Sequence, residues 1–445
     1  MAIQLPASPI RPLLRTMIRR ALDSVHAGSA LRRVVVKDGD MLTVGRRRYD
    51  LRRYERVVVV GAGKATAPMA RAVEQVLGRR LHSGLVIVKY GHTVPTKRIR
   101  VEEAGHPIPD RAGQAAAERL RALVSSLNVR DLLIVLLSGG ASSLMPAPVP
   151  GITLADKQLV TRQLLRCGAT IGEMNTVRKH LSNLKGGRLA ESTKATVITL
   201  ILSDVLGDDL SSIASGPTAP DPTTYGEAVD CLKRYGIWVS TPKTVRVHLE
   251  QGSRGLLAET PKPRAPLFRR VHHRIIGNSQ LALVAVTRAA REAGLRTVLY
   301  SPAMAGEARD VGFRFGALAR GILAEKNPLA RPCCIVAGGE TTVTVKGNGK
   351  GGRAQEFSVA AAKAIAGLPN VWVAAIGTDG TDGPTDVAGA LVSGETLVRA
   401  RRRGVDLDSA LARNDTYRAL KALRSHIMTG PTGTNVNDLY LLFVL

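Results

Sequence analysis

Short apolar runs alternate with longer amphipathic segments along this chain, and a glycine-rich turn follows most of the runs. Clear runs lie at residues 57–60, 132–137, 197–202, 333–337 and 371–376. Continuous apolar runs are typical of strands that are buried on both faces of a parallel sheet. Their alternation with helices favours βα units over a sandwich. The pattern therefore predicts an α/β protein whose polar loops follow the carboxyl ends of strands, where open sheets bind ligands.

Two segments define the expected domain organisation. Residues 13–25 place apolar side chains at helical spacing, so we expect an amphipathic helix that packs on a core. Residues 252–266 hold three prolines and show no periodicity, which indicates a boundary. We predict a domain at 1–252, a linker at 253–266 and a second domain at 267–445. The run Ile275-Ile276-Gly277-Asn278-Ser279 would open the second domain.

The length and charge of the chain limit its partners. At 445 residues it exceeds the usual size of one core, and 63 Lys and Arg against 36 Asp and Glu give a net charge of +27. Such a charge attracts small anions and, without sequence preference, nucleic acid. The cations are scattered in short clusters, and aromatic residues make up only 3%, which is poor material for stacking bases. We expect no specific nucleic-acid partner.

The cysteines and the lengths of the apolar runs bear on location. The four cysteines show no C-x-x-C spacing, so neither a zinc site nor a disulfide framework is expected. No apolar run reaches the about 20 residues that span a bilayer. We predict a cytoplasmic protein without a membrane partner.

The stretch from residue 333 to 356 joins an apolar strand to a glycine-rich basic loop. We expect the strand to stop at Gly338-Gly339, with Glu340 open to ligand and Arg353 carried by a mobile loop. Glycines let backbone N–H groups approach a phosphate, and cations neutralise its charge. A solvated hairpin turn is the alternative interpretation of such a loop.

The turn Gly61-Ala62-Gly63-Lys64 is neither a Walker A motif nor a complete G-x-G-x-x-G fingerprint. It places Lys64 at a helix N-terminus, where backbone amides attract an anion. A solvated first-turn lysine is the alternative.

A polar helix and an aspartate-rich loop carry further candidates. Asn175 and Arg178 share one face of a helix expected to start at 175 and continue to 189, and Arg178 would clamp a carboxylate. His180 is either a base or a structural histidine. The loop with Asp379, Asp382 and Asp386 offers hard oxygen ligands suited to Mg²⁺ with nucleotide phosphates, unless these are turn-forming Asp-Gly pairs. Asp204 and Glu340 are additional metal candidates.

Long motifs in this order resemble those of the glycerate 2-kinase family with a MOFRL C-terminal domain. They are GAGKA at 61–65, LLSGGASSLM at 136–145, MNTVRKHLSNLKGGRLA at 174–190, SDVLGDDLSSIASGPTAPD at 203–221, GGETTVTVKGNGKGGRAQE at 338–356 and GTDGTDGPTDVAGA at 377–390. The resemblance implies two Rossmann-like α/β domains with an active-site cleft between them. It also implies phosphorylation of D-glycerate at the 2-hydroxyl by ATP with Mg²⁺ or a similar divalent cation, giving 2-phosphoglycerate and ADP.

The resemblance suggests a role for each candidate residue. Lys64 and Arg353 would be catalytic. Substrate contacts are expected at Ser138, Gly139 and Gly140 through backbone amides, at Arg178 through the glycerate carboxylate, and at Asn175 and Lys179. Nucleotide contacts are expected at Asp204, Asn278, Gly338 and Gly339, and metal ligands at Glu340, Asp379 and Asp386.

Two other functions compete with the kinase, and a homodimer is the default assembly. An NAD(P)H-dependent hydroxypyruvate reductase acts on the same three-carbon skeleton. The missing third glycine after Gly63 counts against a dinucleotide site. A nucleic-acid-binding protein would depend on charge alone.

Overall fold

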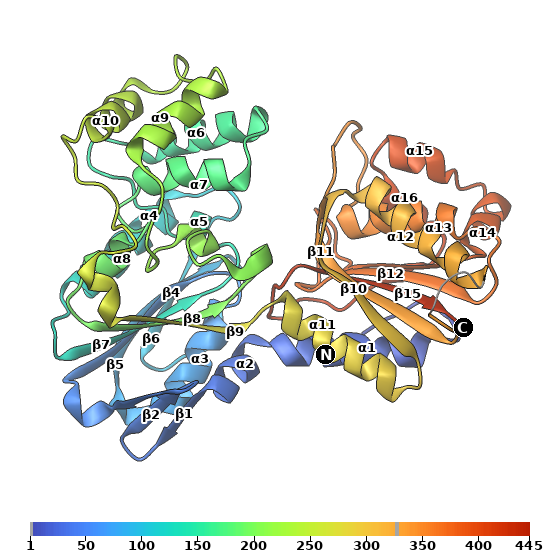
Figure 1. The fold of residues 1–445 in the computed structure, drawn as a ribbon, viewed down its shortest axis with the longest axis horizontal. Helices are drawn as coiled ribbons and strands as arrows, with labels where there is room; N and C mark the ends of the chain where they lie inside the picture. Colours follow the sequence, from blue (N-terminus) through green and yellow to red (C-terminus); the bar gives the residue numbers. More distant parts are fainter. Residues whose placement is uncertain (1–2, 325–328) are drawn as a thin grey trace. The chain divides into compact units, whose positions relative to one another are not determined.

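Two six-stranded sheets organise the chain into two α/β units (Figure 1). The structure is a computed structural model that describes residues 3–324 and 329–445. Unit A comprises residues 27–276. Unit B comprises the described residues up to 26 together with those from 277 to the C-terminus. The predicted α/β class is confirmed.

The main sheet of unit A supports the predicted parallel arrangement. Its order is β6 (Ile99–Ala104), β5 (Leu81–Lys89), β4 (Arg56–Ala62), β7 (Asp131–Leu137), β8 (Thr196–Leu202) and β9 (Val271–Gly277). Strands β4 to β8 run parallel to their neighbours, and every residue of β7 is buried. The helices α3 (Thr66–Leu77), α4 (Arg111–Ser125) and α5 (Ala141–Leu144) connect and cover these strands. A small antiparallel sheet holds β1 (Val35–Asp38), β2 (Met41–Val44) and β3 (Arg47–Asp50), after α2 (Ala27–Val34).

A helical layer with its own core completes unit A. It contains α6 (Leu154–Arg166), α7 (Ile171–His180), α9 (Tyr225–Arg234) and α10 (Lys243–Ser253) (Figure 1). Thr153, Thr170 and Thr224 begin three of these helices with capping boxes. The prediction of a helix that continues to residue 189 is wrong. Helix α7 ends at His180, and only the short α8 (Arg188–Glu191) follows. Gly186 and Gly187 lie between them with φ of +58° and +84°, which a helix does not allow.

The sheet of unit B is mixed, which corrects the expectation of parallel units throughout. Its order is β10 (Arg296–Glu307), β11 (Cys333–Thr342), β15 (Asp438–Val444), β12 (Val371–Gly377), β13 (Gly389–Ser393) and β14 (His426–Ile427). Only β10 and β11 pair in parallel. The C-terminal strand β15 inserts antiparallel between β11 and β12. Its first residue, Asp438, therefore lies beside the ends of both neighbours, opposite Gly339 and Gly377.

Helices cover both faces of the sheet in unit B (Figure 1). On one face α11 (Ser279–Glu292) packs on β10 and β11, and α1 (Arg11–Val25) packs on α11. On the other lie α12 (Ala308–Leu323), α13 (Arg353–Ala364), α14 (Thr396–Arg402), α15 (Leu407–Ala412) and α16 (Thr416–Ala422). The predicted N-terminal amphipathic helix is confirmed, since its apolar stripe from Leu14 to Val25 is buried.

The packing divides the chain differently from the predicted domains. The N-terminal helix belongs to unit B, and the strand at 271–277 belongs to the sheet of unit A instead of opening the second domain. The stretch predicted as a linker lies inside unit A. Hydrogen bonds from Asp221 to the Pro261 carbonyl (2.9 Å) and from Thr260 to the Asp221 carboxylate (3.0 Å) fasten it there.

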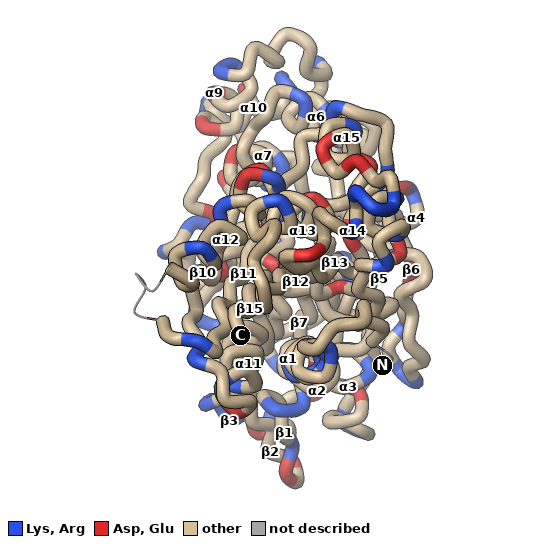
Figure 2. Tube along the Cα trace, turned by 90° about the vertical axis from the view of Figure 1, so that its right-hand side faces the viewer, with Lys and Arg blue, Asp and Glu red and all other residues tan. Residues whose placement is uncertain are grey.

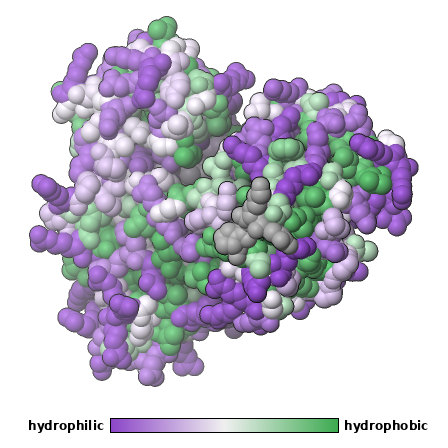
Figure 3. Space-filling model, turned by 45° about the vertical axis from the view of Figure 1, so that its right-hand side comes forward, coloured by the Kyte–Doolittle hydropathy of each residue, from purple (hydrophilic) through white to green (hydrophobic). Residues whose placement is uncertain are grey.

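The surface is strongly charged and largely hydrophilic. Lys and Arg are distributed along most elements of the trace and are not gathered on one of them (Figure 2). In the face seen in Figure 3, hydrophilic side chains cover most of the surface and apolar areas lie between them. Within the described residues, no helix combines the length and the apolar composition needed to cross a bilayer.

The contact between α12 and α13 gives a test of the packing in unit B. A Cβ on Gly312 would lie 2.3 Å from the Phe357 carbonyl oxygen, whereas a Cβ on Gly321 of the same helix would meet nothing within 4 Å. We expect Gly312→Ala to destabilise the protein by about 1–3 kcal/mol through overpacking. Gly321→Ala is the control and should be neutral or stabilising by up to about 1 kcal/mol. Thermal unfolding of both variants checks the contrast; equal melting temperatures would contradict it.

Candidate functional site

Two strand-to-helix turns meet at the carboxyl edge of the sheet in unit A. Gly63 has φ of +139°, and a Cβ there would lie 2.1 Å from the Ser138 hydroxyl oxygen, so only glycine fits. The Ser138 hydroxyl accepts from the Ala65 amide (3.0 Å), and the Lys64 amide donates to the Gly139 carbonyl (2.9 Å). These contacts lock the turn after β4 to the turn after β7.

This packing changes the interpretation of Ser138. The side chain is buried, and the backbone amide donates to the Ala62 carbonyl (3.2 Å). Ser138 therefore holds the two turns together, and its amide is already used, against the prediction that it receives substrate. Gly140 is placed differently. It has φ of +86° and lines a cavity beside the turn.

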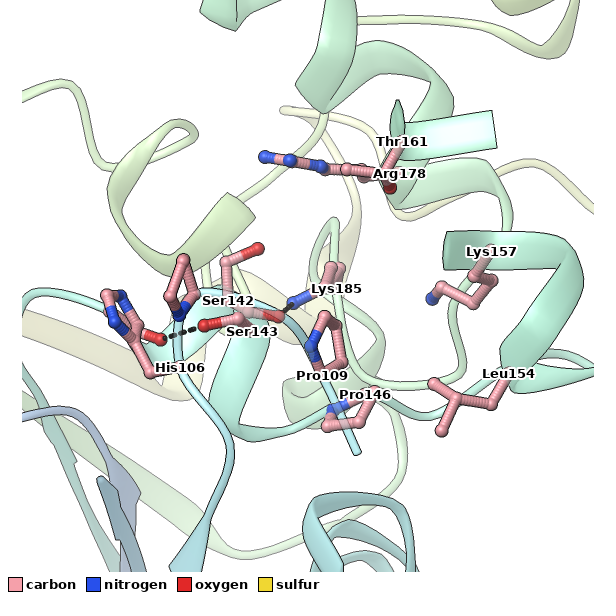
Figure 4. A pocket seen from close by; sticks show the side chains of 12 residues that line it. His106, Pro109, Ser142, Ser143, Pro146, Leu154, Lys157, Thr161, Arg178 and Lys185 are labelled. Atoms are coloured by element: carbon pink, nitrogen blue, oxygen red, sulfur yellow. Dashed lines mark hydrogen bonds between the residues drawn. The ribbon is translucent and has the colours of Figure 1, made fainter. Parts of the chain in front are cut away.

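A cavity of about 230 Å³ opens next to Gly140 (Figure 4). Its polar lining residues are His106, Ser142, Ser143, Lys157, Thr161, Arg178 and Lys185, and the prolines at 107, 109 and 146 and Leu154 complete it. The volume lies below the range of about 300–1,000 Å³ typical of drug-sized ligands, which suits a small molecule. A Cβ on Gly140 would lie 3.4 Å from Cγ of Lys64, so the stem of Lys64 lies close to Gly140, a lining residue, although Lys64 itself does not line the cavity.

Three cationic side chains from different segments line the cavity. The Lys157 ammonium donates to the Leu181 carbonyl (3.0 Å), and the Lys185 ammonium donates to the Ser142 carbonyl (2.8 Å). The Arg178 guanidinium, from the last turn of α7, makes no hydrogen bond or ion pair within the part of the chain that the structure describes. Figure 4 shows the three around one space, with His106 on the side opposite Lys157.

The electrostatics of the cavity favour an anionic ligand. Burial lowers the pKa of Lys157 to about 7, helped by the charges of Arg178 and Arg188. Burial lowers the pKa of Lys185 well below its ordinary value, and lowers that of Arg178. No carboxylate is among the residues that line the cavity. A carboxylate or phosphate entering it would supply the missing negative charge.

The neighbouring candidates on α7 have structural partners instead. Lys179 forms a buried ion pair with Asp221 (3.1 Å), and Asn175 accepts a hydrogen bond from Ser215 (3.0 Å). His180 lies between the Thr176 carbonyl (2.7 Å) and the Glu259 carboxylate (3.1 Å). Burial would raise the pKa of Asp221, but the Lys179 charge and the hydrogen bonds of Thr223 lower it. The predicted substrate contacts of Asn175 and Lys179 are therefore not supported by this arrangement.

In unit B, Arg353 lies at the convergence of strand ends but is already paired. Its guanidinium contacts Glu340, and its Nε lies 2.7 Å from Oδ2 of the buried Asp438. Burial raises the pKa of Asp438 to about 7, and the Arg353 charge opposes that shift. Strand β11 also continues past Gly338-Gly339 to Thr342, so the predicted stop is wrong. Arg353 and Glu340 are brought together as an ion pair, with Asp438 as an unpredicted third member.

The glycine-rich loop before Arg353 is fastened along its length. The Lys346 and Gly347 amides donate to the Asn414 side chain (2.8 and 2.9 Å), and the Lys350 amide donates to Asp415 (3.1 Å). A Cβ on Gly349 would lie 2.5 Å from that of Asp415. The loop's glycines thus allow close backbone packing, and its amides at residues 346, 347, 349 and 350 are used within the protein. The mobile phosphate-cradling loop stays a prediction, and in this arrangement these four amides do not face a ligand.

The predicted nucleotide contacts fall in both units. In unit B, Asn278 caps α11 by accepting from the Leu281 amide (3.0 Å), and a Cβ on Gly338 would lie 3.1 Å from the Ser279 hydroxyl. The Ser279 hydroxyl is buried and has no hydrogen-bond partner among the residues that the structure describes. A Cβ on Gly339 would lie 2.1 Å from the Met304 carbonyl. Asp204 follows β8 in unit A.

The side chains of the aspartate-rich loop have partners within the protein, and their role as metal ligands stays a prediction. Asp382 accepts from the Ala354 and Gln355 amides (3.0 and 2.9 Å) at the start of α13, and Asp386 accepts from the Tyr417 hydroxyl (2.8 Å). Asp379 accepts from the Thr381 amide (3.0 Å). Across residues 3–324 and 329–445, no three acidic, His or Cys side chains are grouped so that they would hold an ion. The set Glu340, Asp379 and Asp386 is therefore not assembled as a protein-only site.

Lys157, Lys185, His106 and Asp438 were not predicted as site residues. Lys185 lies in the same motif as Arg178, at residues 174–190. This shared motif could have indicated that Lys185 belongs to the site. Lys157 lies within an ordinary amphipathic helix, and no local pattern distinguishes it from a solvated lysine.

Comparisons with known proteins agree with the motifs. A family model described as "Domain of unknown function (DUF4147)" matches residues 13–250, and the MOFRL family model matches 333–438. A D-glycerate 2-kinase from Thermotoga maritima is 43% identical over 87% of this chain and 90% of its own length. The chain belongs to the glycerate 2-kinase family. A crystal structure of glycerate kinase from Thermotoga maritima has a TM-score of 0.85 at 38% identity, covering 98% of this chain and 99% of the other.

Membership of this kinase family confirms the predicted class of enzyme. One relative has a different name. A protein of Agrobacterium vitis, 44% identical over 87% of this chain and 87% of its own length, is provisionally named a hydroxypyruvate reductase. Both names refer to three-carbon substrates. The arrangement of the site therefore bears on which reaction, phosphorylation or reduction, this chain catalyses.

The two neighbouring cations of α7 give a test that separates a structural residue from a ligand-binding one. We expect Lys179→Met to destabilise the protein by about 3–5 kcal/mol, because it leaves the buried Asp221 carboxylate without its partner. Arg178→Met is the matched control and should leave stability unchanged or raised, because Arg178 is half-buried without a carboxylate. Urea unfolding measures both; a stable Lys179→Met variant would contradict the structural role.

Proposed function

We propose that this protein is a D-glycerate 2-kinase that transfers the γ-phosphoryl group of ATP to the 2-hydroxyl of D-glycerate, giving 2-phosphoglycerate and ADP. One observation carries the proposal: a small cavity lined by Lys157, Arg178 and Lys185 lies beside Lys64 in a chain of the glycerate 2-kinase family. Phosphoryl transfer depends mainly on positioning and on neutralising negative charge. The cavity offers both for a small anionic acceptor.

The proposed roles follow from the position of each cation. Arg178 would bind the glycerate carboxylate with two N–H groups, since its guanidinium lines the cavity without a carboxylate partner. Lys64, at the N-terminal end of α3, would stabilise charge on the transferring phosphoryl group. Arg353 would do the same only after exchanging at least one of its carboxylate partners for phosphate. This exchange is a requirement of its proposed role.

The donor and the divalent cation are part of the proposal. A kinase needs a nucleoside triphosphate, and ATP is the donor that the family resemblance implies. Asn278, Gly338 and Gly339, together with the buried Ser279 hydroxyl, are the candidate contacts in unit B. Mg²⁺ would enter as the complex with ATP, because the described side chains do not assemble three protein ligands. The four cysteines are free thiols, which suits the proposed cytoplasmic location, and a homodimer remains the expected assembly.

Hydroxypyruvate reduction is the second candidate because of the name of the Agrobacterium relative. The turn after β4 has the first two glycines of a dinucleotide fingerprint, but Thr66 stands at the place where the third would be. The cation-rich cavity serves anion binding in either reaction, so the assay must decide.

The assay that tests the function incubates the enzyme with D-glycerate and MgATP, measures ADP, and separates 2- from 3-phosphoglycerate. We expect glycerate-dependent ADP formation with 2-phosphoglycerate as the product. A parallel assay follows NADH and NADPH oxidation with hydroxypyruvate. Cofactor oxidation without ADP formation would replace the kinase by the reductase, and 3-phosphoglycerate would overturn the regiochemistry.

Lys64 and Arg353 are tested by charge removal. Lys64→Met and Arg353→Met should each lower kcat by on the order of 10² or more, because each removes stabilisation of the transition state. Lys97→Met, at an exposed position, is the control for loss of one positive charge. Because Arg353→Met also unpairs Asp438, its unfolding must be measured in parallel. Near-normal turnover in both folded variants would disprove the assigned roles.

Arg178 is tested by the separation of binding from catalysis. We expect Arg178→Ala to raise the KM for glycerate by roughly ten-fold or more, with the KM for ATP nearly unchanged, because a charged hydrogen bond is worth about 1.5–3 kcal/mol. Steady-state kinetics with each substrate varied checks this. An unchanged KM for glycerate would place the carboxylate elsewhere.

A further inference from the structure

Lys157 and Lys185 are buried lysines. Among the described residues they have no carboxylate partner, unlike Lys179 and Arg353. Their exposed fractions are 9% and 2%. Lys179, equally buried, is paired with Asp221, and Arg353 is paired with Asp438. A buried ammonium without a carboxylate partner destabilises the folded protein. Such a group is usually found where it is needed to bind a ligand.

The hydrogen bonds of Lys157 and Lys185 within the described residues use only part of their N–H donors. An ammonium has three N–H donors, and each of these lysines uses one on a backbone carbonyl, of Leu181 or Ser142. Arg178 adds a guanidinium with up to five donors on the same cavity. The donors outnumber the acceptors, so the matching ligand is a small anion with several oxygens.

The charged groups around Lys157 come from several elements and are mostly positive. Arg178 on α7 and Arg188 on α8 both lower its pKa, and Lys185 and His106 line the same cavity. The nearest acid in sequence, Asp156, uses its carboxylate in the capping box with Thr153. Arg188 donates to the Tyr225 hydroxyl (3.0 Å). The local charge is therefore compensated only when an anion enters.

We propose that Lys157 and Lys185 form, with Arg178, a three-cation site for the carboxylate of a small hydroxy acid, and that Lys157 takes up a proton when this anion binds. The inference rests on the proposed function, because it names how the glycerate substrate is held. Lys157 and Lys185 reach the cavity from segments on either side of α7 in the chain, so cations from three segments would contact the acid.

Proton uptake follows from the position of the ammonium in the empty cavity. Burial lowers the pKa of Lys157 to about 7, so at pH 8 most molecules hold it neutral. An anion in contact with the ammonium favours the charged form and raises its pKa. Above pH 7 binding therefore consumes a proton, and glycerate affinity weakens as pH rises, by at most tenfold per pH unit.

Isothermal titration calorimetry of the intact protein with D-glycerate, without nucleotide, tests the site directly. Titrations at pH 8 in two buffers of different ionisation enthalpy give the number of protons exchanged. We expect an uptake of about one proton per glycerate from Lys157, and of up to about two where Lys185, whose pKa burial also lowers, takes one up as well. Zero uptake or proton release by the wild-type protein would overturn the inference, whatever the behaviour of variants.

The variant Lys157→Met tests whether Lys157 takes up the proton when glycerate binds. Lys157→Met should lower the proton uptake by about one proton and weaken glycerate binding at least tenfold at pH 7, while unfolding at an equal or higher temperature, because a desolvated charge is removed. The stabilisation should be larger at pH 6 than at pH 9, since the wild-type lysine is charged at the lower pH. Lys97→Met is the control. Uptake in Lys157→Met equal to that of the wild-type protein would overturn the assignment to Lys157.

Two further experiments distinguish this proposal from a phosphoryl site and from the proposed kinase function. Inorganic phosphate in place of glycerate tests for a phosphoryl site: tight phosphate binding with no glycerate binding would overturn the carboxylate assignment. The kinase assay keeps the two proposals distinct. Glycerate-dependent ADP formation without proton uptake would disprove this inference alone, whereas proton-linked glycerate binding without ADP formation would disprove the kinase and leave the site.

Discussion

The close approach of the turns after β4 and β7 is the constraint on which the candidate site depends. Gly63 leaves room for the Ser138 hydroxyl, which holds the amide at the start of α3, and the Lys64 amide is bonded to Gly139. A side chain at residue 63 would separate the turns. Because the turns are locked together, Lys64 and Gly140 lie next to each other and the cavity has a rigid wall on this side.

The cations of this basic protein differ in how their charge is compensated. Lys179, which supports the fold, pairs with the carboxylate of Asp221, and Arg353 pairs with Asp438 and Glu340. The cations of the cavity have backbone carbonyls or no partner within the described residues. Burial without a counter-charge destabilises the folded protein, and a ligand anion would relieve it. The same chain thus uses lysine and arginine for two physically different purposes.

Sequence motifs and structure differ most in the glycine-rich segments. In the turn after β4 the glycine allows a packing contact that positions a lysine, as the motif suggested. In the loop before Arg353 the glycines allow equally close packing, but the loop's amides are used by Asn414 and Asp415, which lie far along the chain. Glycine in a motif indicates close backbone approach. Whether the approaching group is a ligand or another part of the protein is decided by the fold.

The sequence by itself determined several central strands, the N-terminal helix, the α/β class and the family, because these depend on local apolar periodicity and on long motifs. It also proposed Lys64 and Arg178 as site residues. Only the tertiary structure decided the insertion of β15 between β11 and β12, the assignment of α1 to unit B, and the partners of each charge. The physical reason is that a strand's neighbours and a lysine's counter-ion are set by residues distant in sequence. Lys157 and Lys179 look alike in the chain and differ only in what the fold places beside them.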